Sequence, residues 1–432
     1  MALPVKFEEP FDYFTKCLQC FKEYQYLFKF PNTDLLTENV LDYIEVDEIN
    51  ELTINKNCDL RYTGCTYLDI FFEKFDELKS EYTTIKYTDL DFLLNVPLSP
   101  KKKHEITYLA KEIKDFCEEI DCETVVDFGS GLGYLDQQLY ETTNLNVLGL
   151  ECNENNYVAA KRRQRKYHIN SLARVKYIKH TINENSRNNI EEYLCDKFLN
   201  CDSFCITGLH ACADLTIDAI NIFLNSKTAN GLVIMSCCYH RMISENGRFK
   251  NFPLSDALKE CCDENSLEIL SIPFLRLAAQ TSNLGTRIED SVFNLLARAV
   301  LQVYAFRNNL ILKRTKRKAV RLKSVKNNFE DYVQDALAGY QLIYGDRLNK
   351  TENINFDVGE IISIWRELSD TTFKKAAIFV FLQNYLQPVF ENFILYDRLI
   401  YLQERGILSC KYKKIVNNNI SPRCLALIVK KH

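Results

Sequence analysis

The chain has 432 residues, more than one hydrophobic core usually organises, so at least two regions are expected. Apolar residues make up 47% of the sequence, which excludes a largely disordered chain. The formal net charge of −4 excludes a polyelectrolyte binder, so any affinity for nucleic acid must come from local patches.

The 17 cysteines indicate reduced thiols rather than disulfides, because the N-terminus carries Glu8 and Glu9 instead of an unbroken apolar leader. No stretch approaches the roughly 18 uncharged apolar residues that a membrane span needs. The strongest candidate, residues 376–382, is far too short. We therefore expect a cytoplasmic or nuclear protein with no membrane contact.

Residues 1–98 are predicted to form a helical N-terminal region. Apolar side chains recur at helical spacing at Phe7, Phe11, Phe14, Leu18, Phe21 and Phe28. Such a stripe is one face of a helix, which docks on the rest of this chain or, less commonly, binds a protein partner. Segments 35–44 and 68–78 continue the helical pattern.

Residues 99–432 show short β-branched runs that alternate with helical segments. The predicted strands are 124–128, 146–150, 175–178, 204–207 and 231–235. The predicted helices are 106–120, 135–140, 155–167 and 216–223. This alternation indicates βαβ units and a parallel sheet.

A mainly helical, basic insertion is predicted at about 275–375, followed by a helix at 393–404. Residues 411–416 and 424–429 then read as an antiparallel hairpin. Five parallel strands with a C-terminal antiparallel hairpin make a Rossmann-like, seven-stranded sheet of the class I methyltransferase type. The expected fold is therefore α/β, with a helical N-terminal region and a helical insertion.

A loop with three glycines follows the first predicted strand, and its members are Asp127, Gly129, Ser130, Gly131 and Gly133. Glycines let the backbone turn sharply and approach a ligand. Their G-x-G-x-G spacing differs from the G-x-G-x-x-G of dinucleotide folds. An acid before the glycines suits S-adenosylmethionine, which carries an ammonium and a sulfonium but no phosphate.

A second acid, Glu151, ends the second strand, where a carboxylate can accept both ribose hydroxyls. Together the two acids favour S-adenosylmethionine over a nicotinamide cofactor or a sheet without a ligand. Polar residues after the second and third strands are predicted to line the adenosine pocket, with ordinary polar loops as the alternative. They are Cys152, Asn153, Asn155, His180, Thr181 and Asn183.

Two chemically active segments follow the fourth and fifth strands, which place them at one edge of the sheet. Either His210 or His240 is predicted to act as the general base, with Asp214 orienting an imidazole. Tyr239 is predicted to stack on a planar acceptor.

The same segments contain the metal-ligand types His210, Cys212, Cys237, Cys238 and His240. The adjacent cysteines lack the two-residue gap of ordinary zinc knuckles, so we predict no metal. Packed core thiols are the main alternative at Cys237 and Cys238.

These motifs together resemble the methyltransferase-like protein 25 family, also described as ribosomal RNA adenine dimethylase domain-containing proteins. The motifs are PKKKHE at 100–105, DFGSGLG at 127–133, GLHAC at 208–212, SCCYH at 236–240, NFPLS at 251–255, RLA at 276–278 and DRLIYLQE at 397–404. The resemblance covers nearly the whole chain. It implies a Rossmann-like methyltransferase that binds S-adenosylmethionine. Lys103 or His104, in the basic turn before a helix, is predicted to lie near the cofactor carboxylate, with a solvated charge run as the alternative, and His210 is predicted to lie beside the cofactor.

More distantly, the histidines and cysteines at 210–212 and 237–241 are similar to a eukaryotic family that methylates tRNA ribose 2′-hydroxyls. The Asp/Asn-Pro-Pro-Tyr signature of adenine methylation is missing after the fourth strand. Adenine dimethylation is therefore disfavoured.

Two basic clusters, 161–166 and 313–326, predict contact with RNA phosphates. The alternative is a solvated helix face, and the second cluster also reads as a nuclear localisation signal. The sequence thus predicts a methyltransferase acting on RNA, at ribose or base. The rivals are a protein side-chain methyltransferase and a non-catalytic cofactor-binding interaction module.

Overall fold

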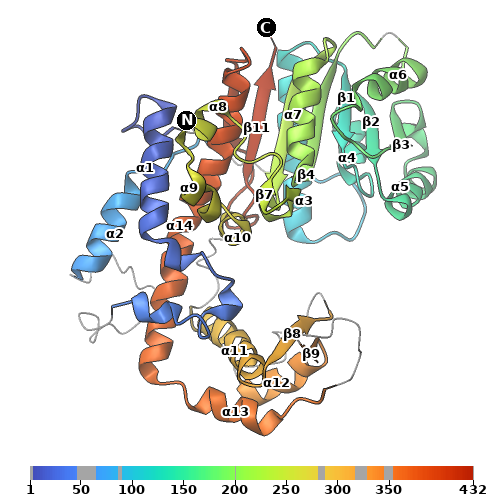
Figure 1. Cartoon of the computed structure of the whole chain (residues 1–432). Helices are drawn as coiled ribbons and strands as arrows, with labels where there is room; N and C mark the ends of the chain where they lie inside the picture. The colour runs from blue at the N-terminus through green and yellow to red at the C-terminus, as the bar shows by residue number, and fades with distance from the viewer. Residues whose placement is uncertain are drawn as a thin grey trace. The chain divides into compact units, whose positions relative to one another are not determined.

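The computed structural model describes residues 3–45, 65–85, 90–199, 201–280, 288–316, 328–344 and 354–431 (Figure 1). The chain divides into two compact units. Unit 1 comprises Met1–Leu18, Leu78–Thr281 and Val389–His432, and unit 2 comprises Gln19–Glu77 and Ser282–Pro388. The N-terminal region and the long helix α14 (Asp370–Gln403) contribute residues to both.

Unit 1 is built on a seven-stranded sheet with the order β10-β11-β5-β4-β1-β2-β3. The strands are β1 (Thr124–Phe128), β2 (Asn146–Glu151), β3 (Val175–Lys179), β4 (Phe204–Cys212), β5 (Ala229–Cys237), β10 (Cys410–Lys414) and β11 (Leu425–Lys430). The first five are parallel, whereas β11 runs antiparallel to both β5 and β10. This arrangement confirms the predicted mostly parallel sheet with its C-terminal hairpin.

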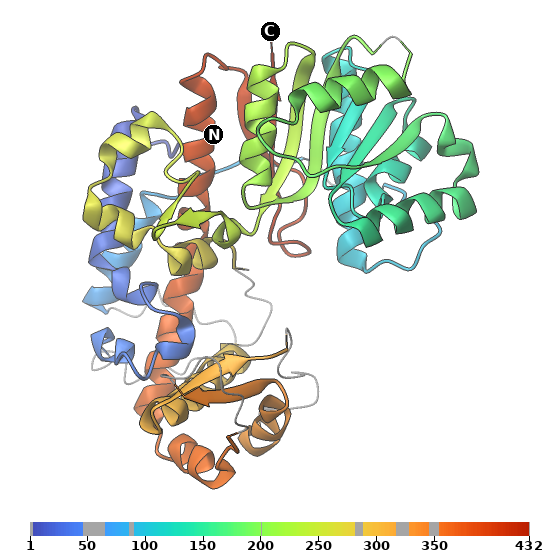
Figure 2. The same cartoon turned by 45° about the vertical axis from the view of Figure 1, so that its right-hand side comes forward.

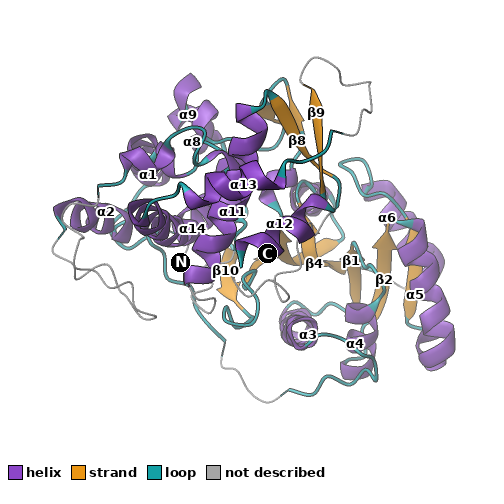
Figure 3. Cartoon of the chain, turned by 90° about the horizontal axis from the view of Figure 1, so that it is seen from below, coloured by secondary structure: helices purple, strands orange, loops and turns teal. Residues whose placement is uncertain are grey.

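Helices connect the parallel strands. They are α4 (Tyr134–Thr142), α5 (Glu154–Tyr167), α6 (Arg187–Lys197) and α7 (Leu215–Asn225), and α3 (Pro100–Glu119) precedes β1. Seen from below, α3 and α4 lie on the same side of β4, β1 and β2 (Figure 3). Their apolar residues share one buried core with Val125, Val147 and Val175 of the sheet. This core fixes the strand ends on which the candidate site is built.

Two helices of unit 1 differ from the sequence prediction. Helix α3 begins at Pro100, six residues before the predicted start, because Ser99 caps it and proline is suited to the first turn. Helix α6 is not predicted from the sequence, since only Ile190 and Leu194 are buried along a largely polar segment.

Unit 1 also contains the first part of α1 (Pro10–Glu23), which continues past Leu18 into unit 2. Its remaining elements include α8 (Asp256–Cys261), α9 (Glu264–Ile269), α10 (Ile272–Ala278) and the short strands β6 (Ser244–Glu245) and β7 (Arg248–Phe249) (Figure 2). Phe14 of α1 is fully buried, and its ring packs edge-on against Phe393, with 5.4 Å between the centroids. The predicted aromatic stripe is therefore covered at Phe14 by this chain itself, whereas Phe11 is exposed.

Unit 2 contains α2 (Thr66–Asp76), α11 (Ile288–Arg307), α12 (Phe329–Leu337), α13 (Val358–Arg366), β8 (Leu310–Arg314) and β9 (Tyr340–Tyr344). In its core, Trp365 stacks on Phe329 with 4.2 Å between ring centroids. The described part of the predicted insertion is mainly helical, and the antiparallel pair β8–β9 is an addition that the sequence does not predict. Helix α12 lies between the two strands in sequence, so no short hairpin turn marks them.

The prediction of a helix at 35–44 is also wrong in part. The structure has the 3-10 turns η2 (Asn32–Asp34) and η3 (Val40–Tyr43) in its place. Asn39 has a φ of 51°, a left-handed conformation that interrupts a right-handed helix.

Helix α14 has 34 residues and continues through Pro388. The sequence predicts only 393–404, because an internal proline normally ends or kinks a helix. Among the described helices, α14 included, none combines the length and apolar character needed to cross a bilayer.

Candidate cofactor and acceptor site

The glycine loop joins β1 to α4 in a conformation that needs glycine. Gly129, Gly131 and Gly133 have φ values of 79°, 59° and 74°, in the left-handed region that side chains disfavour. The N–H groups of Gly129 and Ser130 donate to the carbonyl of Leu150 at 2.9 and 3.0 Å. The loop is thereby tied to the end of β2.

Glu151 links this loop to the start of α5. Its Oε2 accepts a hydrogen bond from the Gly131 N–H at 2.8 Å, and its Oε1 accepts one from the Asn153 N–H at 2.7 Å. The second lone pair of Oε2 remains able to accept a hydroxyl, whereas Oε1 also accepts a weak hydrogen bond from Cys152 Sγ at 3.7 Å. The position suits the predicted contact with ribose.

Asp127 lies beneath the loop and is 2% exposed, and its Oδ1 has no hydrogen-bond partner among the described residues. Burial raises its pKa to about 7. Asp136, in the first turn of α4, is also fully buried without a partner for either oxygen among these residues. Burial and the neighbouring Asp127 raise the pKa of Asp136 well above its usual range. Burial of two neighbouring carboxyls therefore favours a proton on this pair.

This loop fits S-adenosylmethionine. A Cβ added to Gly131 would meet no atom closer than 3.9 Å, so the backbone there is open to a ligand. Asp127 Oδ1, which has no hydrogen-bond partner among the described residues, would gain one from a cationic group such as the cofactor's ammonium. Asp136 is a functional candidate that the sequence reasoning missed, and its signal is an acid three residues after Gly133.

For the residues predicted to line the adenosine pocket, the structure gives exposure and hydrogen-bond partners. Cys152 and Thr181 are exposed, and the Asn153 side chain caps α5 by accepting a hydrogen bond from the Asn156 N–H. His180 Nε2 lies 2.8 Å from Ser186 Oγ. Their roles at the adenosine pocket stay predictions.

Lys103 and His104 are engaged by residues outside the glycine loop. The Lys103 ammonium lies 5.5 Å from the centre of the Phe92 ring. His104 Nε2 accepts a hydrogen bond from the Asn417 N–H at 3.1 Å. His104 therefore supports the segment before β11 in this conformation, and its predicted contact with the cofactor carboxylate would need a rearrangement.

His210, near the end of β4, is held by a buried carboxylate. Its Nε2 lies 3.1 Å from Oε2 of Glu105 in α3. The other Glu105 oxygen accepts a hydrogen bond from Ser421 Oγ at 2.6 Å. Burial by itself raises the pKa of Glu105. The hydrogen bonds from His210 and Ser421 lower this pKa by more than burial raises it, so the net pKa lies below its ordinary value. Glu105 is thus ionised and able to orient the imidazole.

Asp214 does not play the orienting role that the sequence suggests. Its Oδ2 accepts a hydrogen bond from the Ile243 N–H at 2.7 Å, and its Oδ1 accepts one from Asn251 Nδ2 at 2.8 Å. Asp214 therefore holds the loop around β6 and β7. The partner of His210 is Glu105, which sequence reasoning missed because the two lie far apart in the chain.

Tyr239 is also placed differently from the prediction. It is 1% exposed, its hydroxyl donates to Glu391 Oε1 at 2.9 Å, and the Arg398 guanidinium lies 5.3 Å from its ring centre. A ring buried in this way cannot stack on an acceptor. His240 is half-buried, and burial together with Arg276 and Arg241 lowers its pKa, so its imidazole is neutral at neutral pH.

Three thiols converge at the ends of β4 and β5. The sulfur atoms of Cys212 and Cys237 are 3.0 Å apart, and those of Cys212, Cys237 and Cys238 all lie within 4.8 Å of one another. The hydrogen bond to Cys237 and the nearby Cys238, His210 and Arg241 lower the pKa of Cys212 to about 6. Negative charge in this group of thiols is therefore favoured at the Cys212 sulfur.

Comparison with known proteins agrees with this geometry. Residues 101–245 match a family described as "Methyltransferase domain". The chain contains an S-adenosylmethionine-dependent methyltransferase domain. The match includes the glycine loop, Glu151, His210 and the three thiols, and it confirms the predicted cofactor class.

The methyltransferase domain also has curated relatives. The human "Probable methyltransferase-like protein 25" is 29% identical over 241 residues, which cover 52% of this chain and 36% of the human protein. The mouse protein of the same name is 28% identical over 239 residues, covering 52% and 37%. The predicted family resemblance is confirmed over about half of the chain rather than nearly all of it. The chain matches well under half of the length of these relatives.

Solved structures give weaker similarities. A structure titled "METTL16 MTase domain" is 15% identical, covers 43% of this chain and 82% of its own, and has a TM-score of 0.26. The SAH-bound methyltransferase PaMTH1 of Podospora anserina is 14% identical and has a TM-score of 0.23. The match covers 30% of this chain and 51% of the PaMTH1 chain.

Proposed function

We propose that the protein is an S-adenosylmethionine-dependent methyltransferase that activates its acceptor with His210, positioned by Glu105, and that this acceptor is RNA. The observation that carries the catalytic part is the paired imidazole and carboxylate beside the glycine loop. Strands β1 and β4 are neighbours, with Asp127 opposite Thr207, so His210 emerges at the same edge as the loop.

The bound cofactor would supply an electrophilic methyl group on its sulfonium. Asp127 and Glu151 would hold its ammonium and ribose ends, and the glycine backbone would let it approach closely. The ionised Glu105 accepts the Nε2–H of His210, which leaves the lone pair of the imidazole on Nδ1. His210 Nδ1 then takes the proton of an acceptor hydroxyl or amine as the methyl group is transferred.

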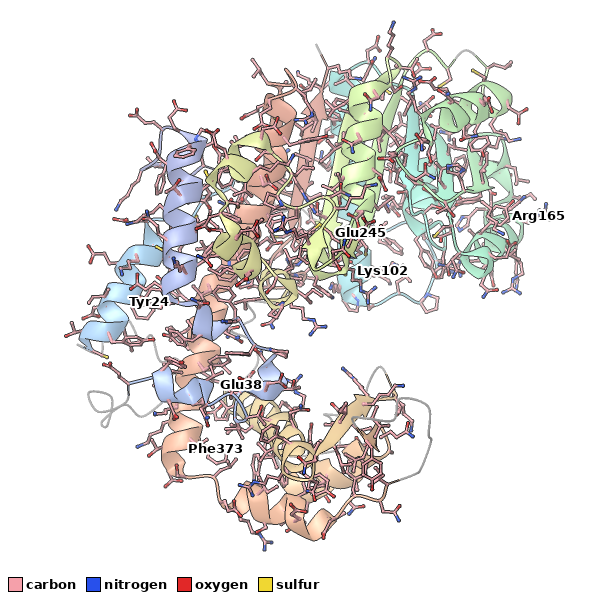
Figure 4. All side chains as sticks on the ribbon, viewed as in Figure 1. Tyr24, Glu38, Lys102, Arg165, Glu245 and Phe373 are labelled. Atoms are coloured by element: carbon pink, nitrogen blue, oxygen red, sulfur yellow. The ribbon has the colours of Figure 1, made fainter. Side chains whose placement is uncertain are left out.

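The RNA acceptor is supported by the surface of α5. An open hollow on this helix is lined by Tyr157, Val158, Lys161, Arg162, Arg165 and Lys166. Arg165 projects from the outer side of the helix, away from the sheet (Figure 4). Clustered cations next to an aromatic ring suit phosphates and unstacked bases.

The distance along α5 from Glu151 to the basic side chains determines which part of a bound RNA they could contact. At a rise of about 1.5 Å per residue, the basic side chains lie roughly 10–18 Å from the helix start beside Glu151. They would therefore anchor phosphates of a flanking strand rather than the methylated nucleotide. In the second basic cluster, Lys313, Arg314 and Lys316 belong to the described part of unit 2, and residues 317–326 lie outside the described residues.

The test is transfer of tritiated methyl groups from S-adenosylmethionine to total cellular RNA and, separately, to a protein extract. We expect label that RNase removes and protease does not. In the double variant Lys161→Glu/Arg165→Glu, RNA labelling should fall at least tenfold, with cofactor affinity unchanged. The control Lys227→Glu changes an exposed cation in the α7–β5 loop and should label RNA normally.

Label that protease removes would replace RNA with a protein acceptor. Cofactor binding without transfer to either extract would favour the non-catalytic interaction module.

A further inference from the structure

The three thiols at the ends of β4 and β5 have the spacing of a metal site. Tetrahedral zinc with Zn–S distances of about 2.3 Å requires sulfur atoms about 3.8 Å apart. The separations in the group run from 3.0 Å, between Cys212 and Cys237, to at most 4.8 Å. A shift of less than about 1 Å in each side chain would bring the three sulfurs to the required spacing.

The backbone explains how two adjacent cysteines reach one point. Successive side chains of a strand point to opposite faces, so Cys237 and Cys238 would diverge if β5 continued. Cys238 instead has a φ of 52°, a left-handed conformation that is rare for a residue with a side chain. Ala213, which follows Cys212, also has a positive φ of 54°. Such strained positions cluster at functional sites.

This group differs from the thiols of the hydrophobic core. Cys117, Cys122 and Cys205 are buried among apolar side chains. Cys212 and Cys238 are instead partly exposed at the sheet edge. Arg241 belongs to the turn that begins at Cys238, and its backbone N–H donates to the Cys238 carbonyl at 2.9 Å. Three thiolates around a dication carry a net negative charge, which a neighbouring guanidinium stabilises.

We propose that Cys212, Cys237 and Cys238 bind one zinc ion through three thiolates. Among the described residues, no fourth histidine, cysteine or carboxylate belongs to the group, so the fourth coordination position is open to water. Zinc sites with three protein ligands and one open position are typical of catalytic rather than purely structural zinc. The site lies at the same edge as His210, where an acceptor would enter.

Zinc content of the full-length protein tests this inference directly. The protein is purified under reducing conditions without a histidine tag, and its zinc is measured by inductively coupled plasma mass spectrometry. We expect about one zinc per chain. Replacement by Co²⁺ should produce thiolate charge-transfer absorption, and X-ray absorption of the zinc form should fit three sulfur scatterers and one lighter atom.

Variants assign the metal to these residues. Cys212→Ser and Cys238→Ser should each lower the zinc content at least tenfold. Cys195→Ser, which changes an exposed thiol on α6, should retain it. Circular dichroism and S-adenosylmethionine binding show whether each variant is folded. Zinc content is measured without cofactor or acceptor, so its outcome is independent of the proposed RNA activity.

Three results would overturn the proposal: wild-type protein that neither retains zinc nor gives cobalt–thiolate bands, zinc that persists in the Cys212→Ser/Cys238→Ser double variant, or a Cys212–Cys237 disulfide in the purified protein. A fit with four sulfur scatterers would overturn the three-thiolate coordination.

Discussion

Glu105 and His210 form a pair in which the carboxylate is buried and the imidazole is accessible. The side chain of Glu105 is 2% exposed and that of His210 is 31% exposed, with Oε2 and Nε2 3.1 Å apart. The carboxylate is therefore placed to orient the ring, while the ring remains able to reach an acceptor. His210 also has a φ of 63°, so the pair sits on strained backbone.

Replacing either member of this pair should slow turnover without weakening cofactor binding. Loss of a general base typically costs about 10²–10⁴-fold in rate, which we expect for kcat of His210→Ala. Glu105→Gln keeps the shape but removes the charge, and should lower kcat about tenfold with little change in KM. Added imidazole should partly restore His210→Ala. If kcat of both variants equals that of the wild type, His210 is not the base.

Asp127→Asn should weaken S-adenosylmethionine binding. It removes the carboxylate that would pair with the cofactor's ammonium, a loss of about 1.5–3 kcal/mol or roughly 10–100-fold in Kd. Isothermal titration calorimetry measures this directly. Asp121→Asn, an exposed position before the start of β1, is the control and should bind normally. An unchanged Kd in Asp127→Asn would contradict the assigned site.

The buried acids Asp127 and Asp136 should make the ligand-free protein less stable as pH rises. Both have a folded-state pKa above the unfolded value of 3.8, so the folded state holds more protons between the two values. Their contribution to the free energy of unfolding is fully present below the unfolded-state pKa of 3.8. For Asp127 this contribution is lost as pH rises through the folded-state pKa of about 7. Asp136→Asn should therefore raise the melting temperature more at roughly pH 8 than at roughly pH 5. An equal effect at both pH values would contradict the raised pKa of Asp136.

Gly133→Ala should destabilise the cofactor loop. An added Cβ would lie 2.1 Å from the Tyr177 hydroxyl oxygen, and Gly133 has a φ of 74°. Overpacking of this kind costs about 1–3 kcal/mol, to which the left-handed backbone adds about 1 kcal/mol. Gly247→Ala is a matched control, because Gly247 has a φ of 79° but no atom within 4 Å of the added Cβ. Equal losses of unfolding free energy in the two variants would remove the steric explanation.

The cofactor side of the site was predictable because its signals are local. Asp127, the glycines and Glu151 follow or end strands that β-branched runs predict. The alternation of strands and helices predicts a parallel sheet, which places these residues at the same edge of that sheet. The acceptor side depends on distant contacts. Glu105 meets His210 and Ser421 only in the folded protein, and a helical pattern alone does not show which acid is buried.

Backbone conformation set a second limit on prediction. The left-handed turn at Cys238 brings adjacent cysteines together, but no glycine marks it. The orientation of Tyr239 was likewise unpredictable, since its burial depends on Glu391 and Arg398 of α14. The strands β8 and β9 were missed because each is short and its partner is distant.

The position of β11 between β10 and β5 has a consequence for synthesis of the protein. The glycine loop, Glu151 and the three thiols have all been made once the chain reaches Cys238, the residue after β5, whereas Ser421 and β11 follow only after α14. Domains generally fold as units as the chain emerges from the ribosome. The nascent protein can therefore form its methyl-donor loop early, but Glu105 gains its Ser421 hydrogen bond, and β5 its outer neighbour, only near the end of translation.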